Sequence, residues 1–278
     1  MNTLTLAPLC AVSLLALAAC GGGSSAPQQV PFNSSTVTTS SEVVPARADV
    51  SRAEDGRILL RMTAGPMDRT TILCEDARLG ACQVVGGPAG TAGTGTLLER
   101  YHGQFAFAGN FSVMQLVDGN LEPTSQLVHA AGIDSAQGHV RLPQGVVSHT
   151  GRFSAGAGLT DGPDGGMVTG DIELLVDFNM GVLGGSISGG FESGEPVEAS
   201  FNNVTINASN GQFAATDDTL FMFQSQVAGG DIRGAFYGPN AQETAGVFNI
   251  GNERGGMSGI FLTCQGAAAN CIRPDPAP

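Results

Sequence analysis

Apolar residues at every second position of residues 171–178 constrain the fold of this chain more than any other feature. Side chains at every second position of an extended strand point to the same side. A second predicted strand over residues 198–206 loses the alternation at Asn202-Asn203. The first stretch predicts a strand with one buried face, whose apolar residues are Ile172, Leu174, Val176 and Phe178.

Turn residues recur about every 8 to 12 residues in the C-terminal half, as they do in sandwiches and closed barrels. Residues 179–181 and Asn210-Gly211 are predicted turns. Strands are expected over residues 220–227 and 232–237, with Gly229-Gly230-Asp231 as the connection between them. No helical segment of comparable clarity occurs in this half, so we expect an all-β fold.

The region of residues 46–141 is expected to be rich in short strands but irregular. Residues 58–62 and 70–74 have the composition of strands. Residues 104–108 and 111–116 are predicted strands around a turn at Gly109-Asn110. The chain is long enough for one large core or two modest ones.

The first twenty residues predict a lipid anchor. A short apolar stretch interrupted by Pro8 runs into Leu17-Ala18-Ala19-Cys20, which matches the bacterial lipobox. We expect residues 1–19 to be a lipoprotein signal peptide and Cys20 to carry the lipid, such as palmitate, that holds the chain on a membrane. Residues 20–45 are rich in Gly, Ser, Thr and Pro and are predicted to be the lipidated cysteine with a flexible linker. Gly21 rather than Asp favours the cell outer membrane.

Charge and composition exclude several classes of function. The formal net charge is −13, and all 12 basic residues are Arg, so no basic patch is available for nucleic acid. The absence of Lys removes P-loop nucleotide binding and Schiff-base chemistry. The chain contains no Trp and only 2 Tyr, which argues against an aromatic platform for sugars.

We predict no enzymatic activity, no cofactor and no metal site. Neither G-x-S-x-G nor H-E-x-x-H occurs in the sequence. Asp161 and Asp164 lack the spacing of an EF-hand. The four histidines are too far apart for a local metal motif, although haem ligation by one of them stays open: His102, His129, His139 and His149.

Four cysteines remain after the signal peptide and Cys20 are set aside, which in an exported chain implies disulfides. Three connectivities are possible. We favour Cys74–Cys82 and Cys264–Cys271, because each pair is close in sequence and brackets turn material, with about 2–3 kcal/mol of stabilisation for each loop. Zinc is the weaker alternative, since the spacing is not C-x₂-C.

Residues 234–248 read GAFYGPNAQETAGVF and resemble the G-x-F-[FY]-G-P-x-A-x-E-x-x-G-x-F motif of transferrin-binding-protein-B-like β-barrels. Residues 142–151 are similar to the family's opening strand, with His149 in an aromatic position. Ala245 departs from the usual Gly. The likeness covers about residues 142–264, and the matching motif positions are Gly234, Phe236, Tyr237, Gly238, Pro239, Ala241, Glu243, Gly246 and Phe248.

The motif has a structural interpretation before a functional one. Phe236 would fill the barrel interior, and Gly238-Pro239 would end a strand in a turn. A carboxylate held in a turn, such as Glu243, most often accepts backbone N–H bonds. The resemblance implies an eight-stranded antiparallel barrel over residues 142–264, preceded by a smaller handle-like subdomain over residues 46–141 and followed by a tail over residues 265–278.

The resemblance also implies a function. Relatives are lipoproteins of the outer membrane, so we expect the chain to face the cell exterior and bind an external protein or a metal- or haem-bearing ligand through barrel and handle loops. Transferrin itself is not carried over, because the ligand loops are not matched. The alternative is a structural or adhesive envelope lipoprotein. An exposed apolar loop patch would favour binding, and residues 159–167 are a candidate loop, although a solvated hairpin tip is the simpler expectation.

Overall fold

The computed structural model contains only strands and turns in its described part, where no helix has the length and apolar character needed to cross a membrane. Side chains are described mainly from residue 141 onward and around residues 59–73 and 101–110. The described backbone comprises residues 32–37, 43–52, 58–64, 69–74, 81–86, 93–117, 120–133, 141–163 and 165–266.

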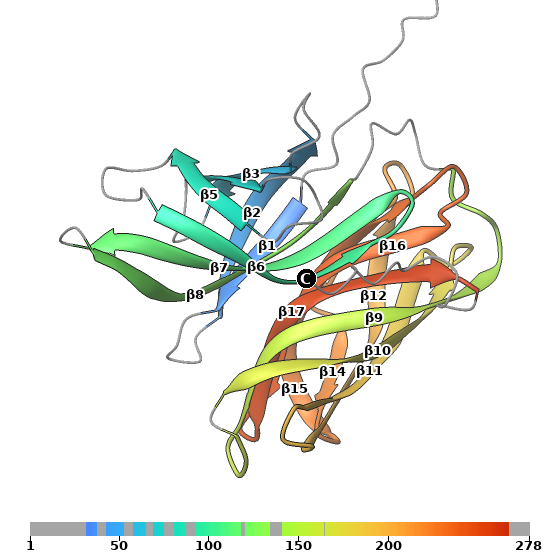
Figure 1. The fold of residues 1–278 in the computed structure, drawn as a ribbon. Helices are drawn as coiled ribbons and strands as arrows, with labels where there is room; N and C mark the ends of the chain where they lie inside the picture. Colours follow the sequence, from blue (N-terminus) through green and yellow to red (C-terminus); the bar gives the residue numbers. More distant parts are fainter. Residues whose placement is uncertain are drawn as a thin grey trace, which may run out of the picture.

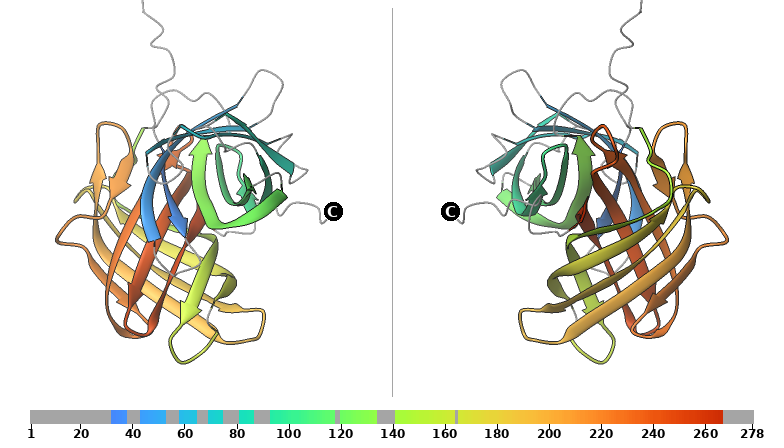
Figure 2. Two further views of the ribbon diagram at one scale, coloured as in Figure 1. Left: turned by 90° about the vertical axis from the view of Figure 1, so that its left-hand side faces the viewer. Right: turned by 90° about the vertical axis from the view of Figure 1, so that its right-hand side faces the viewer.

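The first eight strands form a closed antiparallel barrel in sequential order, because β1 pairs with both β2 and β8 (Figures 1 and 2). This region is therefore more regular than the irregular subdomain that the sequence predicts. The strands are β1 Phe32–Val37, β2 Val43–Arg52, β3 Ile58–Ala64, β4 Thr71–Cys74, β5 Ala81–Gly86, β6 Gly93–His102, β7 Ala106–Val117 and β8 Asn120–Ile133.

The last nine strands form a second closed barrel, as the resemblance predicts. β11 pairs with β12 to close the sheet, and β13 and β14 follow one another between β12 and β15, so nine strands occupy eight positions. The strands are β9 Val146–Leu159, β10 Gly166–Asp177, β11 Val182–Phe191, β12 Pro196–Asn207, β13 Gln212–Ala214, β14 Leu220–Phe223, β15 Gln226–Tyr237, β16 Glu243–Asn252 and β17 Gly255–Gln265.

Aromatic side chains fill the interior of the second barrel. The rings of Phe213 and Phe236 lie 5.5 Å apart, and those of Phe178 and Phe236 lie 5.0 Å apart, which are favourable distances for tilted pairs. The predicted alternation of β10 is confirmed, since Ile172, Leu174 and Val176 are buried. The barrel interior is therefore a packed core in its described part.

Two local predictions are confirmed by the register of the strands. Residues 179–181 form a turn in which Gly181 has φ of 68°. The alternation of β12 slips at Asn202-Asn203, opposite a register shift in β11 between Leu183 and Gly185, and Asn203 has φ of 64°. A β-bulge exchanges the faces of the strand at this point.

Three predictions on elements are corrected. The expected turn at Gly109-Asn110 is absent, because β7 runs through it as one strand and buries Asn110 against the second barrel. The expected strand over residues 220–227 is a hairpin, with its turn at Gln224-Ser225. The expected linker over residues 20–45 includes β1 and the first residues of β2. In each case strand pairing outweighs local turn or linker composition.

Close approach between β10 and β11 requires glycine at position 189, which gives a test of the packed interior. A Cβ on Gly189 would overlap the carbonyl oxygen of Thr169 and lie 2.7 Å from the ring of Phe153. We expect Gly189→Ala to lower the free energy of unfolding by about 1–3 kcal/mol, measured by urea denaturation. Gly229→Ala, where the added Cβ meets nothing within 4 Å, should change it by less than about 0.5 kcal/mol. Equal effects of the two substitutions would contradict this packing.

Candidate functional site

The burial pattern of β16 and β17 shows that the second barrel is covered on one outer side. β10 alternates between buried and exposed positions, as a strand with one face in water should. β17 is buried without interruption from Met257 to Cys264, and β16 from Glu243 to Phe248. Both faces of these two strands are therefore removed from solvent.

The cover is the first barrel. Met257 and Phe261 belong to the interior core, so Ile260 and Leu262, on either side of Phe261, point outward, and they are nevertheless fully buried. β7 and β8 contact β16 and β17 on that outer side. In Figure 1 the hairpin of β6 and β7 reaches across to β16. An apolar interface thus joins the two barrels.

Polar contacts fix the position of β6 and β7 on β9. The hydroxyl of Tyr101 donates to the carbonyl oxygen of Phe153 at 2.8 Å. The amide of buried Asn110 donates to the hydroxyl oxygen of Ser154 at 2.8 Å and to its carbonyl oxygen at 3.2 Å. These bonds satisfy polar groups that the interface removes from water, which would be costly to leave unpaired.

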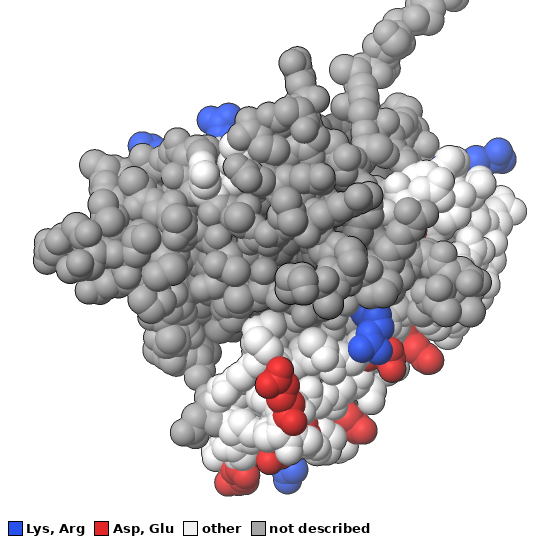
Figure 3. All heavy atoms as spheres, in the orientation of Figure 1, with Lys and Arg blue, Asp and Glu red and all other residues white. Residues whose placement is uncertain are grey.

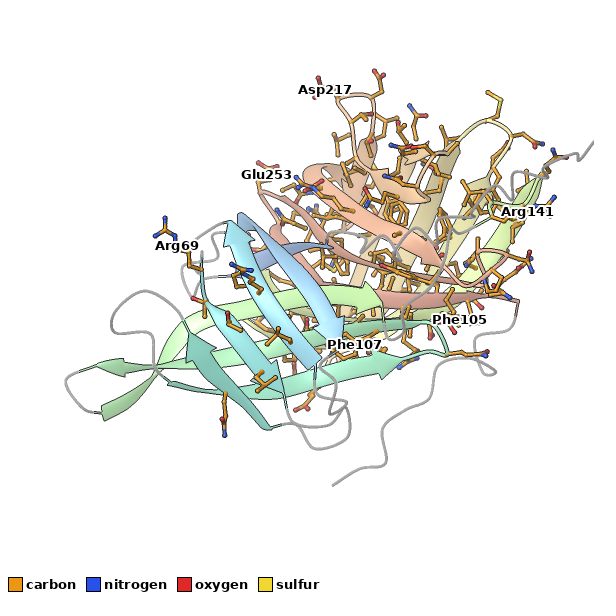
Figure 4. All side chains as sticks on the ribbon, turned by 90° about the horizontal axis from the view of Figure 1, so that it is seen from above. Arg69, Phe105, Phe107, Arg141, Asp217 and Glu253 are labelled. Carbon is orange, nitrogen blue, oxygen red and sulfur yellow. The ribbon has the colours of Figure 1, made fainter. Side chains whose placement is uncertain are left out.

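Among the described contacts between the barrels, Glu243 accepts the most hydrogen bonds. Its carboxylate accepts backbone N–H bonds from Gln104 at 2.7 Å, from Phe105 at 2.8 Å and from Ala106 at 2.8 Å. Gln104 and Phe105 lie in the turn between β6 and β7, and Ala106 is the first residue of β7. Phe105 lies where the first barrel meets the second (Figure 4). The predicted chemistry of Glu243 is present, but the donors come from the other barrel and not from its own turn.

Two opposing effects act on the pKa of the Glu243 carboxyl. Burial raises this pKa above its ordinary value, and the hydrogen bonds from Phe105, Gln104 and Ala106 lower it. Three consecutive N–H groups pointing at one carboxylate resemble the backbone concavities that bind anions. Gly103 makes room for the carboxylate, since a Cβ there would overlap it.

The family motif presents Glu243 to the first barrel. β15 ends at Tyr237, and Gly238 has φ of 81°, which turns the chain as predicted. The N–H of Ala241 then donates to the carbonyl oxygen of Gly238 at 3.1 Å. Phe236 is fully buried in the barrel core, also as predicted. The motif therefore forms part of the interface between the barrels.

His149 is buried at the same end of the barrel. Its Nδ1 lies 3.1 Å from the hydroxyl oxygen of Thr244, and its ring packs edge-on against Phe236 with 5.8 Å between the centroids. Its Nε2 is buried and makes no hydrogen bond. Burial lowers the pKa of His149 from 6.5 to about 4, so the ring is neutral at pH 7.

The other histidines do not join His149. His102 and His129 lie on β6 and β8, where only their backbone is described, and His139 lies outside the described residues. Among the described residues, no group of three or more His, Cys, Asp or Glu side chains is placed to hold a metal ion. A haem could reach His149 only by opening the packed core around it, because the side chain has no exposed surface.

The structure describes three of the cysteines for which disulfides are predicted. Cys264 is disulfide-bonded, and Cys271 lies outside the described residues. The register of β4 and β5 places Cys74 directly opposite Cys82. The pairing of Cys264 with Cys271, and a bond between Cys74 and Cys82, stay predictions. Cys20 also lies outside the described residues.

The predicted candidate loop is a hairpin tip with no large exposed apolar side chain in its described part. Leu159 is partly buried against the core, and the N–H of Thr160 donates to the carbonyl oxygen of Arg254 at 2.9 Å. Asp164 is not described, and Asp161 is exposed in the same loop. Among the side chains that the structure describes, the large exposed apolar ones lie elsewhere, at positions for which the sequence predicts no binding role: Val146, Leu175, Met180, Leu220 and Val227.

Comparison with known proteins identifies the second barrel. Residues 130–265 match the family model described as the C-lobe and N-lobe beta barrels of Tf-binding protein B. The closed eight-position barrel and the 234–248 motif agree with that match. The second barrel is therefore a transferrin-binding-protein-B-like β-barrel.

Several solved structures are similar to the chain. Intact Ap-TbpB, with its N and C lobes, is 15% identical, and the match covers 85% of this chain and 46% of Ap-TbpB, with a TM-score of 0.45. Transferrin binding protein B of serogroup B Neisseria meningitidis is 12% identical, with coverages of 86% and 44% and a TM-score of 0.46. The N-lobe domain of lactoferrin binding protein B of Moraxella bovis is 16% identical, with coverages of 60% and 79% and a TM-score of 0.37.

The chain thus spans about half the length of the intact transferrin-binding proteins that it matches. No curated protein matches it in sequence.

The Glu243 contact predicts a specific loss of stability. Glu243→Gln keeps the shape of the side chain but replaces one acceptor oxygen with an NH₂ group that faces N–H donors. We expect the free energy of unfolding to fall by about 2–4 kcal/mol, measured by chemical denaturation at pH 7. Glu253→Gln is the matched control, because Glu253 is exposed in a turn, and it should have almost no effect. Equal stabilities of the two variants would contradict the proposed role of the carboxylate.

The buried imidazole predicts a pH dependence. Because the folded-state pKa of His149 is lowered, the unfolded chain binds more protons between pH 6.5 and about 4. The stability that the neutral ring contributes is fully present above pH 6.5 and is lost as the pH falls toward 4, by about 3 kcal/mol. His149→Phe should remove this part of the acid sensitivity, which denaturation curves at pH 7 and pH 4.5 measure, with His149→Gln as a second variant. If the free energy of unfolding of both variants fell between pH 7 and pH 4.5 as much as that of the wild type, another group would cause the loss.

Proposed function

We propose that this chain is a lipoprotein of the outer membrane, anchored through Cys20, whose barrels face the cell exterior and bind an external protein or a metal- or haem-bearing ligand. The observation that carries the proposal is a lipobox at residues 17–20 ahead of a barrel of the transferrin-binding-protein-B-like family. The first feature supplies an anchor and the second a binding scaffold. The binding role is the function that this combination supports best.

The surface chemistry supports a protein ligand over nucleic acid. On the face of the second barrel drawn in Figure 3, Asp and Glu side chains outnumber Arg. Such a surface repels phosphates and favours partners with basic groups. Because the core is filled with phenylalanine rings, we place the binding surface on the outside of the barrels and in their loops.

The alternative function is a structural or adhesive envelope protein on the same scaffold. The exposure of large apolar side chains distinguishes the two functions. Leu220 is 68% exposed and Val227 is 79% exposed on adjacent strands, which a purely structural wall does not require. This pair of residues favours binding.

Protease treatment of intact cells of the native organism tests the proposal. If the barrels face outward, proteinase K should release fragments from the loops of the second barrel while a periplasmic marker stays intact, and mass spectrometry should identify them. The Cys20→Ala variant should lose its lipid label and leave the membrane fraction. Cleavage of the wild type only after permeabilisation would place it in the periplasm and end the surface-receptor proposal.

A further inference from the structure

We propose that the outer side of the β14–β15 hairpin, together with the adjacent loop of residues 215–219, is a docking surface for a protein segment that carries an Arg or Lys beside a large apolar side chain. The inference rests on the proposed binding function and names the surface and the class of partner. It has an apolar part and an acidic part.

The apolar part is on adjacent strands. The register places Met222 opposite Val227, and Leu220 lies two residues from Met222 on the same outer face. Leu220 and Val227 are therefore diagonal neighbours, a separation that large side chains of a ligand can bridge. Phe221 and Phe223 point into the core instead, so β14 is apolar on both of its faces.

Gly229 leaves open space beside the apolar side chains. Continuing the register places Gly229 opposite Leu220, and a Cβ on Gly229 would meet nothing within 4 Å. The outer surface of the barrel is therefore recessed at Gly229, and the side chains of Leu220 and Val227 project on neighbouring positions. We call Leu220, Met222, Val227 and Gly229 the lateral patch. An apolar side chain of a partner would lie on Gly229.

The acidic part is the loop of residues 215–219, which interrupts the barrel wall between β13 and β14. Asp217 and Asp218 are exposed, and neither forms an ion pair with another described residue. The neighbouring Asp231 is already paired with Arg233 at 2.5 Å. Two carboxylates next to an apolar patch are complementary to a basic side chain next to an apolar one.

Hydrogen bonds hold the loop in place before any partner arrives. The N–H of Thr216 donates to the hydroxyl oxygen of Thr219 at 2.9 Å, and that hydroxyl donates to the carbonyl oxygen of Asn203 at 3.2 Å. The side-chain amide of Asn203 donates to the carbonyl oxygen of Asp218 at 3.3 Å. The bulge of β12 therefore supports the loop, and preorganisation lowers the entropy cost of binding.

The surface lies away from the main contact between the two barrels in the described part of the chain. Figure 4 shows Asp217 on the side of the second barrel that is turned away from the first barrel. The first barrel packs mainly on β16 and β17, and the lateral patch lies on β14 and the opening residues of β15. A partner can therefore approach it without disturbing the Glu243 contact.

The other exposed apolar residues provide a matched comparison. Val146, Leu175 and Met180 are 59%, 61% and 74% exposed near the β10–β11 turn. The carboxylate of Asp177, two residues from Leu175, already accepts the N–H groups of Asn179 and Met180 at 3.0 Å. This group is therefore less suited to a basic partner than the lateral patch.

A phage-displayed library of random 12-residue peptides, panned against the immobilised full chain, tests the inference. We expect enrichment of peptides with Arg or Lys within a few positions of a large apolar residue. One enriched peptide, labelled with fluorescein, then serves as the probe in binding titrations. Leu220→Ser with Val227→Ser should weaken its binding by about tenfold or more, and Asp217→Asn with Asp218→Asn should weaken it and reduce its salt dependence. Val146→Ser with Leu175→Ser should leave it unchanged.

Each other outcome overturns the inference. Enriched peptides that bind the Leu220/Val227 variant as tightly as the wild type, or the absence of any basic and apolar consensus, would show that the lateral patch does not select such a segment. Concentration-dependent dimerisation of the wild type that these substitutions abolish would assign the patch to a second copy of the chain. Thermal melts confirm that the surface variants fold. The proposed function fails separately, in the protease test on cells, which does not depend on this patch.

Discussion

The carboxylate of Glu243 is the contact on which the arrangement of the two barrels depends. It accepts hydrogen bonds from the N–H groups of three consecutive residues at the β6–β7 turn. No other side chain in the described contacts between the barrels accepts as many hydrogen bonds. A turn that points three N–H groups into an interface would otherwise leave them unsatisfied. The carboxylate in turn needs those donors, because burial disfavours its charge.

The glutamate acts together with an apolar interface. The outward side chains of β16 and β17 are buried by the first barrel, so this side of the second barrel forms the apolar interface. Other strands, such as β10, have an outer face exposed to solvent. Apolar area supplies attraction without direction, and the bonds of Glu243, Tyr101 and Asn110 supply the register. The solvent-facing walls and loops stay available for a partner.

The sequence was sufficient for much of the second barrel. The apolar face of β10 and the slip at Asn202-Asn203 follow from local pattern, and the interior position of Phe236 follows from the resemblance to the family motif. The hairpin turn at Gln224-Ser225 could not be predicted in the same way, because its two residues adopt positive φ without a glycine, and the neighbouring glycines lie inside β15. The continuous burial of β17 could have been suspected from residues 257–264, where polar residues do not alternate with apolar ones.

The interface between the two barrels could not be predicted from the sequence. Chemistry alone predicted that Glu243 accepts backbone N–H bonds, but its donors are more than 130 positions away, and nothing local in residues 104–106 indicates them. Asn110 was similar, because a Gly-Asn pair suggests a turn unless a partner across the interface is known. The lateral patch left one local indication, which is the run of four apolar residues in β14.

The most direct test of the interface is hydrogen exchange at the backbone amides of Gln104, Phe105 and Ala106 in the full chain, compared between the wild type and Glu243→Gln. We expect strong protection of these amides in the wild type and a loss of protection in the variant that is larger than any loss at the amides of β10. Equal protection of residues 104–106 in the two proteins would contradict the claim that this carboxylate holds the barrels together.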